Sequence, residues 1–402
     1  MTASGREMRP TLSDTLSILL PTEQDTLLLR ACLCSDDTGR KAWTAWLERV
    51  GEPREKLSQP RPALVHLLPL LYVAARRCNV EVEGEFAFRL RAAHFREELR
   101  SQAYRATLRR VLHVLRDGEI DFTVLKGAAL AGTVYDDWAL RHCHDIDLLV
   151  HETDQAAACR ALQDAGVGQC CEPSRTSRDV QLLHDSGLPI ELHTDLFEHP
   201  FYRCGAAAML GRRQTTDIAG IPVHVLSPSA ALLHVCGHAS NSRNRSSLRW
   251  VTDAWSIAAK CADLDWDAFL WDTTRAKLAL PLHVMLEYLA AQLGAPIPRP
   301  VLESLARDAA RAGPRAREAA LFGVHETHRR LREATHDWRS RALLLRWWLF
   351  PSPSCLRWAY GVRSRSEVFL LYLERIVRHV ARRVRLVLAR MDRIRQMRKA
   401  SS

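Results

Sequence analysis

The chain has 402 residues, 47% of them hydrophobic, so it is long enough for two or three domains and has the composition of a folded globular protein. Its formal net charge is +11, but from Arg357 to the end thirteen Lys and Arg face only three acidic residues, and the rest is nearly neutral. Because the basic character belongs to the C-terminal segment, we expect no DNA partner for the core.

The eleven cysteines are scattered and include no Cys-x-x-Cys pair, which argues against a structural zinc site or a thioredoxin-like motif. The N-terminus is polar, with Arg6, Glu7 and Arg9 before any apolar run. No apolar stretch reaches the roughly 18 residues of a membrane span. We therefore expect a cytoplasmic protein with free thiols.

Residues 24–116 carry apolar side chains at helical spacing, interrupted by Pro60 and Pro62. Beyond these prolines the pattern predicts two further helices, Ala63–Arg77 and Phe86–Arg116.

From Glu119 onward, short apolar runs alternate with helical segments. This order predicts an α+β fold, in which a small mixed β-sheet carries packed helices and is flanked by N-terminal and C-terminal helical regions. The expected strands are Phe122–Leu125, Asp145–Val150, Val180–His184, Pro189–Leu196 and Ile221–Leu226, and the expected helices are Gly127–Asp137 and Asp154–Ala165.

After Ser227 the pattern is helical again. Helices are expected from Pro228 towards His238, over Leu248–Cys261, within 264–345 and over 366–397. The predicted division is an N-terminal helical region (1–117), an α/β core (118–227), a helical domain (228–350) and a basic amphipathic C-terminal helix (351–402).

Two aspartates, Asp145 and Asp147, alternate with apolar residues on the second expected strand. Period-two alternation places both carboxylates on one face. Two like charges at that spacing repel each other unless a cation lies between them. Because oxygen ligands favour Mg²⁺ or Mn²⁺, we predict that both residues are catalytic metal ligands.

Lys126 and Gly127 lie at the strand-to-helix turn that precedes these acids. A helix N-terminus offers free N–H groups and the positive end of the helix dipole, which suit phosphate, and Gly127 leaves room for its approach. Arg141 adds a permanently charged donor. These three residues together are predicted to bind the nucleotide, although Lys126-Gly127 alone is more typical of a plain turn and Arg141 alone of a surface position.

A later strand carries Glu191, His193 and Asp195 on one face. If this strand lies beside Asp145 and Asp147, Glu191 becomes a third acid for the same metals, as two-metal phosphoryl transfer requires. His193 is a candidate for the acceptor pocket, with a hydrogen-bonded sheet residue as the alternative. Asp195 is more simply an ordinary polar residue.

The segments TVLKGAALA (123–131), RHCHDIDLLV (141–150) and PIELHTDL (189–196) resemble the bacterial nucleotidyltransferase-family proteins of the NTP_transf_5 type, within the DNA-polymerase-β-like superfamily. Together with thinner likeness on either side, the resemblance covers about residues 63–260. It implies Mg²⁺-dependent transfer of a nucleoside monophosphate, AMP being expected, from NTP. The three acids would then ligate the metals, and the three nucleotide-binding candidates would hold the triphosphate.

The usual Gly-Ser of the superfamily is Gly127-Ala128 here, so the hydroxyl that touches phosphate is missing. Lys126 is the candidate to compensate. The departure keeps a second hypothesis open, a nucleotide-binding or adaptor protein that has lost turnover. The sequence does not identify the acceptor substrate, which could be a peptide, a sugar or a small metabolite.

His234 and His238 lie four residues apart on an expected helix and share a face. No glutamate between them completes the His-Glu-x-x-His motif of metalloproteases. We place both in the acceptor pocket, with two core-facing histidines as the alternative.

The last expected helix, 366–397, repeats apolar residues at steps of four and three. This pattern is typical of a helix on an anionic membrane, of a helix paired with a partner helix, or of a cap on its own domain. RNA binding through its arginines is a further alternative, although no aromatic residues for base stacking accompany them.

Overall fold

The computed structural model describes residues 16, 20–50, 62–170, 179–197, 202, 206–241, 248–313, 316, 320, 353, 356, 364–375 and 377. The chain divides into two compact units, Met1–Ser174 with Arg178–Leu331, and Arg175–Ser177 with Arg332–Ser402. The first unit holds the sheet, the helices around it and every candidate site residue. The four-part division expected from the sequence stays a prediction.

Within the described residues, seven strands form one mixed sheet in the order β3-β4-β5-β2-β1-β7-β6. β2 is antiparallel to β1 and parallel to β5, and β1 is parallel to β7. This arrangement confirms the expected α+β fold. The strands are β1 (Phe122–Val124), β2 (Ile146–Val150), β3 (Gln169–Cys170), β4 (Val180–Leu183), β5 (Pro189–His193), β6 (Arg213–Ile218) and β7 (Ile221–Leu226).

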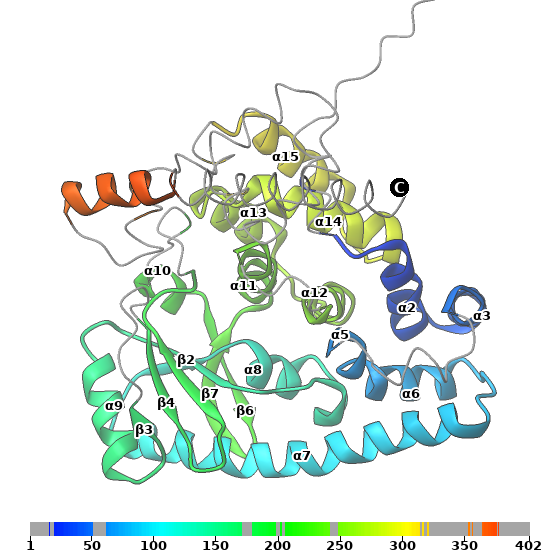
Figure 1. Ribbon diagram of the computed structural model, residues 1–402, viewed down its shortest axis with the longest axis horizontal. Helices are drawn as coiled ribbons and strands as arrows, with labels where there is room; N and C mark the ends of the chain where they lie inside the picture. Colours follow the sequence, from blue (N-terminus) through cyan, green and yellow to red (C-terminus); the bar gives the residue numbers. More distant parts are fainter. Residues whose placement is uncertain are drawn as a thin grey trace, which may run out of the picture. The chain divides into compact units, whose positions relative to one another are not determined.

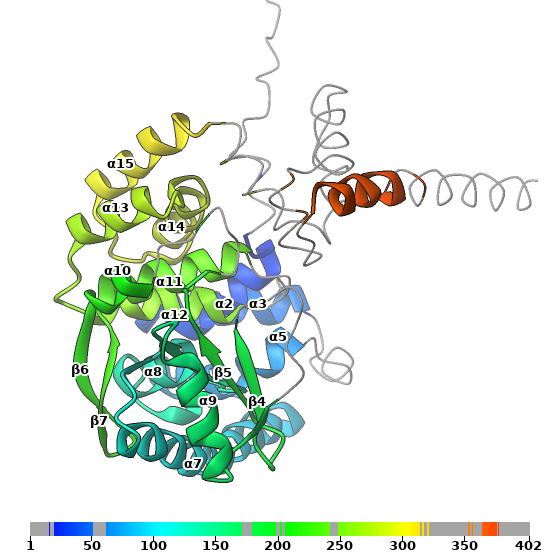
Figure 2. The same cartoon turned by 90° about the vertical axis from the view of Figure 1, so that its left-hand side faces the viewer.

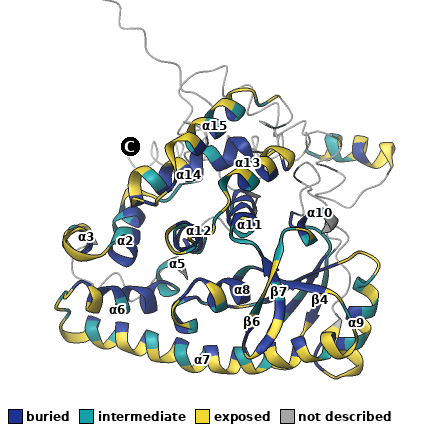
Figure 3. Ribbon diagram, turned by 180° about the vertical axis from the view of Figure 1, so that it is seen from behind, coloured by how far each residue is buried: buried dark blue, intermediate teal, exposed yellow. Residues whose placement is uncertain are grey.

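Among the helices that contact the strands are α7 (Gly84–Asp117), α8 (Lys126–Thr133) and α9 (Gln155–Asp164). Figure 1 shows α7 as the long helix beneath the strands, reaching from α9 to α6. Buried and exposed residues alternate along it (Figure 3), as an amphipathic helix with one face on the core requires. Leu108, Leu112 and Leu115 are fully buried on that face.

The other helices of the first unit share a second core, in which Trp43, Phe269 and Leu286 are fully buried. Among them α11 contacts α8 and β7 and therefore lies at the edge where β1 and β7 end. Figure 2 shows α11 and α12 between the strands and α13–α15. These helices are α2 (Glu23–Leu33), α3 (Asp36–Val50), α5 (Pro62–Val65), α6 (Leu68–Arg77), α10 (Ala206–Leu210), α11 (Pro228–Asn241), α12 (Arg249–Lys260), α13 (Trp266–Arg275), α14 (Ala279–Leu293) and α15 (Arg299–Ala310).

Helix α8 ends four residues before the expected end at Asp137. The Thr133 hydroxyl donates back to the Ala129 carbonyl at 2.7 Å, a bond that competes with the helix ladder. Asp137 instead caps a short 3₁₀ helix, η2 (Trp138–Leu140), by accepting from the Ala139 N–H at 2.8 Å. This early exit starts the connection to β2.

Strand β5 ends at His193, not at Leu196. Asp195 lies in the bend that follows, where its carboxylate accepts from the Phe197 N–H at 3.4 Å. The expectation that Asp195 continues the strand face of Glu191 is therefore wrong. Asp145 likewise directly precedes β2 instead of starting it.

The sequence pattern missed β3 and β6. β6 reads Arg-Gln-Thr-Thr-Asp-Ile and lies at the sheet edge, where only its last residue is buried, so no apolar alternation marks it. The expected single helix Ala63–Arg77 is broken into α5 and α6.

In the second unit, residues 365–375 are helical, and Phe369, Leu370 and Leu373 are exposed while Val368 is buried. Most of the expected helix 366–397 lies outside the described residues. Among the helices that the structure describes, none is both long and apolar enough to cross a membrane.

Candidate active site

The candidate site lies at the sheet edge where β2 and β5 begin and β1 ends. The parallel register of these two strands places Asp147 opposite Glu191, and His193 follows two residues later on the same face. The Leu125 N–H donates to the Asp147 carbonyl at 2.9 Å, which holds the start of α8 beside β2. The structure thus brings Lys126, Asp147, Glu191 and His193 together.

Asp147 is the buried centre of this group, with 1% of its surface exposed. Lys126 Nζ and His193 Nε2 each lie 2.8 Å from its Oδ1. Its second oxygen, Oδ2, is buried and has no hydrogen-bond partner. Burial alone would raise the pKa of Asp147, but the Lys126 charge and the His193 hydrogen bond outweigh it and hold the pKa well below the usual value.

His193 bridges two carboxylates, because its Nδ1 also lies 3.0 Å from Asp179 Oδ2. Burial and the Lys126 charge lower the pKa of His193, but the hydrogen bonds to Asp147 and Asp179 outweigh them and raise it to about 9. The side chain is therefore an imidazolium at neutral pH in the absence of a metal. A metal ion that used Nε2 would displace its proton.

Glu191 and Asp145 carry the remaining negative charge of the cluster. Glu191 Oε2 lies 3.5 Å from His193 Nε2, and burial and the Asp147 charge raise the pKa of Glu191. Burial, with the Asp147 charge added to it, raises the pKa of Asp145 to about 6. The Tyr104 hydroxyl donates to the Asp145 carbonyl at 2.9 Å and so anchors this residue at the start of β2.

The cluster fits a divalent cation on two observations. Asp147, Glu191 and His193 each offer one ligand atom, and these atoms all lie within 4.8 Å of one another. The buried, unpartnered Oδ2 of Asp147 supplies a free carboxylate oxygen. Two carboxylates with one imidazole suit Mn²⁺ at least as well as Mg²⁺, since imidazole favours the transition metals.

Arg141 lies in a buried ion pair with Asp253 of α12. Its Nε and Nη2 donate to the two Asp253 carboxylate oxygens at 2.7 and 2.8 Å, and the Tyr135 hydroxyl donates to the same carboxylate at 2.8 Å. Its Nη1 donates to the His142 carbonyl at 2.6 Å. Each guanidinium nitrogen of Arg141 therefore donates a hydrogen bond within the protein. A nucleotide contact for this residue stays a prediction.

Gly127 is buried against the loop that leads into β2. A Cβ atom at this position would lie 3.2 Å from Cys143 Sγ and 3.7 Å from Arg141 Nη1. This close approach gives the glycine a packing reason that sequence reasoning missed. Lys126 itself has a φ of 44°, a left-handed backbone conformation that is uncommon for a side chain with a Cβ.

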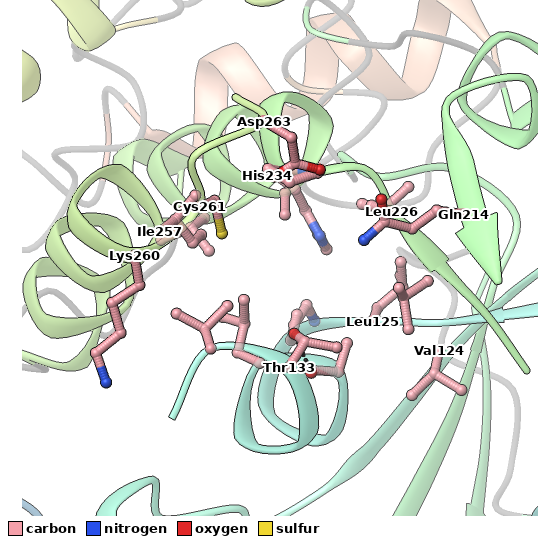
Figure 4. Close-up of a pocket in the computed structure, with 18 residues that line it drawn as sticks. Val124, Leu125, Thr133, Gln214, Leu226, His234, Ile257, Lys260, Cys261 and Asp263 are labelled. Carbon is pink, nitrogen blue, oxygen red and sulfur yellow. Dashed lines mark hydrogen bonds between the residues drawn. The ribbon is translucent and has the colours of Figure 1, made fainter. Parts of the chain in front are cut away.

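The two histidines of α11 differ in their surroundings. His234 is 2% exposed and its Nε2 has no hydrogen-bond partner, whereas His238 is exposed. Their ring centroids are 6.1 Å apart. His234 lines a cavity of about 230 Å³ (Figure 4). Lys126 also borders this cavity. His234 is thus next to the acidic cluster, although an acceptor role for it, for His238 and for His193 stays a prediction.

Sequence reasoning assigned no role to Asp179, His142 or His144. Asp179, which contacts His193, precedes a short strand without any local motif. His142 and His144, on the loop between Arg141 and β2, are held by partners from other elements: Glu97 lies 2.9 Å from His142 Nδ1, and Arg249 lies 3.0 Å from His144 Nδ1. No local sequence signal marks these long-range partners.

A family model described as an uncharacterised nucleotidyltransferase matches residues 65–294, which is more than half of the chain and includes every candidate site residue. Neither a curated protein nor a solved structure shows a significant match to this chain.

Proposed function

The chain belongs to this family of uncharacterised nucleotidyltransferases, and we propose that it transfers a nucleoside monophosphate, AMP, from NTP to an acceptor with the help of Mg²⁺ or Mn²⁺. The observation that carries the proposal is the β2–β5 register, which sets Glu191 opposite an Asp147 that has one unpartnered oxygen. This geometry supports a metal site and leaves the acceptor, a peptide, a sugar or a small metabolite, open.

In this proposal Asp147 and Glu191 hold the cation with Asp145 beside them, and His193 is the nitrogen ligand that the structure adds to the set. The bound cation would neutralise charge on the transferred phosphate. The acceptor oxygen forms a bond to the α-phosphorus while the bond to the bridging oxygen breaks, and pyrophosphate leaves. Lys126 and the N-terminal N–H groups of α8 stabilise the pyrophosphate charge.

A second candidate function, nucleotide binding without turnover, has one observation in its favour. Lys126 and His193 already place two cationic groups on Asp147 Oδ1. These internal cations balance the charge that a metal would otherwise balance. Together with Ala128 in place of the expected serine, this arrangement is compatible with a protein that has lost catalysis.

Labelled ATP separates the two functions. We expect the protein, incubated with α-labelled ATP, Mn²⁺ or Mg²⁺ and a cell extract, to transfer label to an acceptor, and Asp145→Ala/Asp147→Ala to abolish the transfer. The matched control Asp121→Ala/Asp164→Ala removes two exposed carboxylates elsewhere on the same unit and leaves transfer unchanged. Metal-dependent ATP binding without transfer supports the second function, and transfer that survives the double substitution contradicts the proposed site.

A further inference from the structure

The cavity beside the acidic cluster is built mainly from aliphatic side chains of five elements, two strands and three helices. Val124 and Val225 come from neighbouring strands, Leu130 from α8, Val235 from α11 and Ile257 from α12. In Figure 4, Val124 and Leu226 close one side, and Ile257 lies opposite them across the open space. The polar groups Thr133, Gln214, Lys260 and Asp263 are exposed and therefore belong to the mouth of the cavity, not to its buried wall.

One buried polar side chain borders this apolar space. His234 points into the cavity in Figure 4, and its Nε2 is buried without a partner in the protein. A buried polar atom without a partner costs free energy, on the order of 1–3 kcal/mol. Burial, with the Lys126 charge acting in the same direction, holds the pKa of His234 well below its usual value, so the ring is neutral and suits an uncharged partner.

The cavity and the proposed phosphate site share one residue. Lys126 borders the cavity, and its Nζ lies 2.8 Å from Asp147 Oδ1. A group that occupies the cavity is therefore next to a phosphate bound at the start of α8. The charged phosphates themselves do not suit an aliphatic pocket whose buried wall offers only a neutral imidazole besides Lys126.

We propose that this cavity holds the nucleobase of the nucleoside triphosphate, with His234 Nε2 as the hydrogen-bonding partner of the base. A base is uncharged, largely apolar on its faces and polar only at its edge, which matches aliphatic walls with one buried polar atom. A sugar or a peptide backbone would need more hydrogen-bond partners than the buried wall provides. The inference rests on the proposed function and places His234 on the nucleotide side of the site, not on the acceptor side.

Equilibrium binding tests the base pocket without turnover. The probes are ATP, CTP, GTP, UTP and inorganic tripolyphosphate, each with Ca²⁺. We expect the best of the four nucleotides to bind at least about tenfold more tightly than tripolyphosphate, because only the nucleotide adds the base contacts. His234→Phe and Ala231→Leu, which remove the polar atom and fill the cavity, should bring nucleotide affinity down to that of tripolyphosphate.

The matched control is Ala239→Leu, the same substitution on the same helix at a residue of similar burial that does not line the cavity. It should leave all affinities unchanged. Unchanged tripolyphosphate binding in His234→Phe and Ala231→Leu shows that these variants are folded. If both folded variants keep the wild-type affinity for the nucleotide, the base pocket is wrong, but the proposed function is not contradicted. Absence of binding by every probe, tripolyphosphate included, overturns the proposed function as well.

A labelling experiment keeps the inference testable if both variants fail to fold. Cys261 lines the cavity and is half-buried with a free thiol, and Cys34 is a half-buried free thiol outside the cavity. We expect the preferred nucleotide, but not tripolyphosphate, to slow alkylation of Cys261 at least about threefold, because a bound base blocks access to it. Cys34 is the internal control and should react at the same rate throughout. Equal Cys261 rates with the nucleotide and with tripolyphosphate contradict the base pocket.

Discussion

Two buried carboxylates, Asp147 and the Asp253 of α12 that pairs with Arg141, differ in how completely the protein satisfies their hydrogen-bonding capacity. Asp253, the partner of Arg141, has both oxygens hydrogen-bonded by the guanidinium and one of them also by Tyr135. Asp147 has two cationic groups on Oδ1 and nothing on Oδ2. Arg141 and Asp253 are both buried, so their pair fixes the loop to α12, whereas Asp147 keeps coordination capacity for a ligand.

The largest expected effect is on the Arg141–Asp253 pair. Asp253→Asn should lower the free energy of unfolding by about 3–5 kcal/mol, because it leaves a buried guanidinium without its counter-charge. The loss should be the same with and without Mn²⁺, since this pair is structural. Urea unfolding followed by circular dichroism measures both values.

The matched control for this first substitution is Asp136→Asn. Asp136 also pairs with a cation, Lys260 at 2.9 Å, but its side chain is 82% exposed. A surface pair of this kind contributes less than about 1 kcal/mol. If Asp253→Asn and Asp136→Asn lowered the free energy of unfolding equally, the buried, fully hydrogen-bonded carboxylate would not differ in stability from an exposed one.

The second prediction concerns the unsatisfied oxygen. Mn²⁺ at a hundred times its dissociation constant should stabilise the wild-type protein by about 2.7 kcal/mol, because it binds only the folded state. Asp147→Asn should abolish this stabilisation, and Arg141→Lys, which keeps the charge in the structural pair, should retain it. Urea unfolding with and without Mn²⁺ provides the test, and a metal-induced gain in Asp147→Asn equal to that of the wild type would contradict the site.

The third prediction concerns which metal the site prefers. Because His193 adds a nitrogen to two carboxylates, Mn²⁺ should bind about tenfold more tightly than Mg²⁺. His193→Gln should reduce that preference, whereas His151→Gln, at an exposed histidine one residue after β2, should leave it intact. Calorimetric titration with each metal measures the ratio, and an unchanged ratio in His193→Gln would assign His193 to positioning Asp147 alone.

The comparison of the two carboxylates also shows which features of the site can be predicted from the sequence. Alternation around Asp147 and Glu191 predicted two strands with acids on one face, and hydrophobic runs predicted most of the central sheet, because these signals are local. The structure confirms the α+β class on which those expectations depend. It sets Asp147 opposite Glu191.

Local signals do not specify partners that are distant along the chain. Arg141 and Asp253 are 112 residues apart, and no sequence motif predicts that they form a pair. The contact of Asp179 with His193 depends on how β4 pairs with β5, which the hydrophobic pattern does not encode in detail. Gly127 was interpreted as room for phosphate, while the atom that a Cβ would meet is Cys143 Sγ. Tertiary packing decides all three cases.

The smallest expected effect concerns His66, which packs against the loop between Arg141 and Asp147. The His66 ring stacks on His142 at a centroid distance of 4.1 Å. Burial lowers the pKa of His66 to about 4. The charges of His142, Arg249 and Arg100 lower this pKa further, and the charge of Glu97 acts against them. The unfolded chain therefore binds a proton between pH 6.5 and pH 4 that the folded state does not bind, so stability falls as the pH decreases through this range. His66→Phe should remove this part of the stability loss and keep the stacking, whereas Asp253→Asn should leave the pH dependence of stability unchanged.

Urea unfolding of the wild type and the two variants at pH 7, 5.5 and 4.5 measures how the free energy of unfolding changes with pH. An identical slope in wild type and His66→Phe would mean that the loop is coupled to pH through other groups.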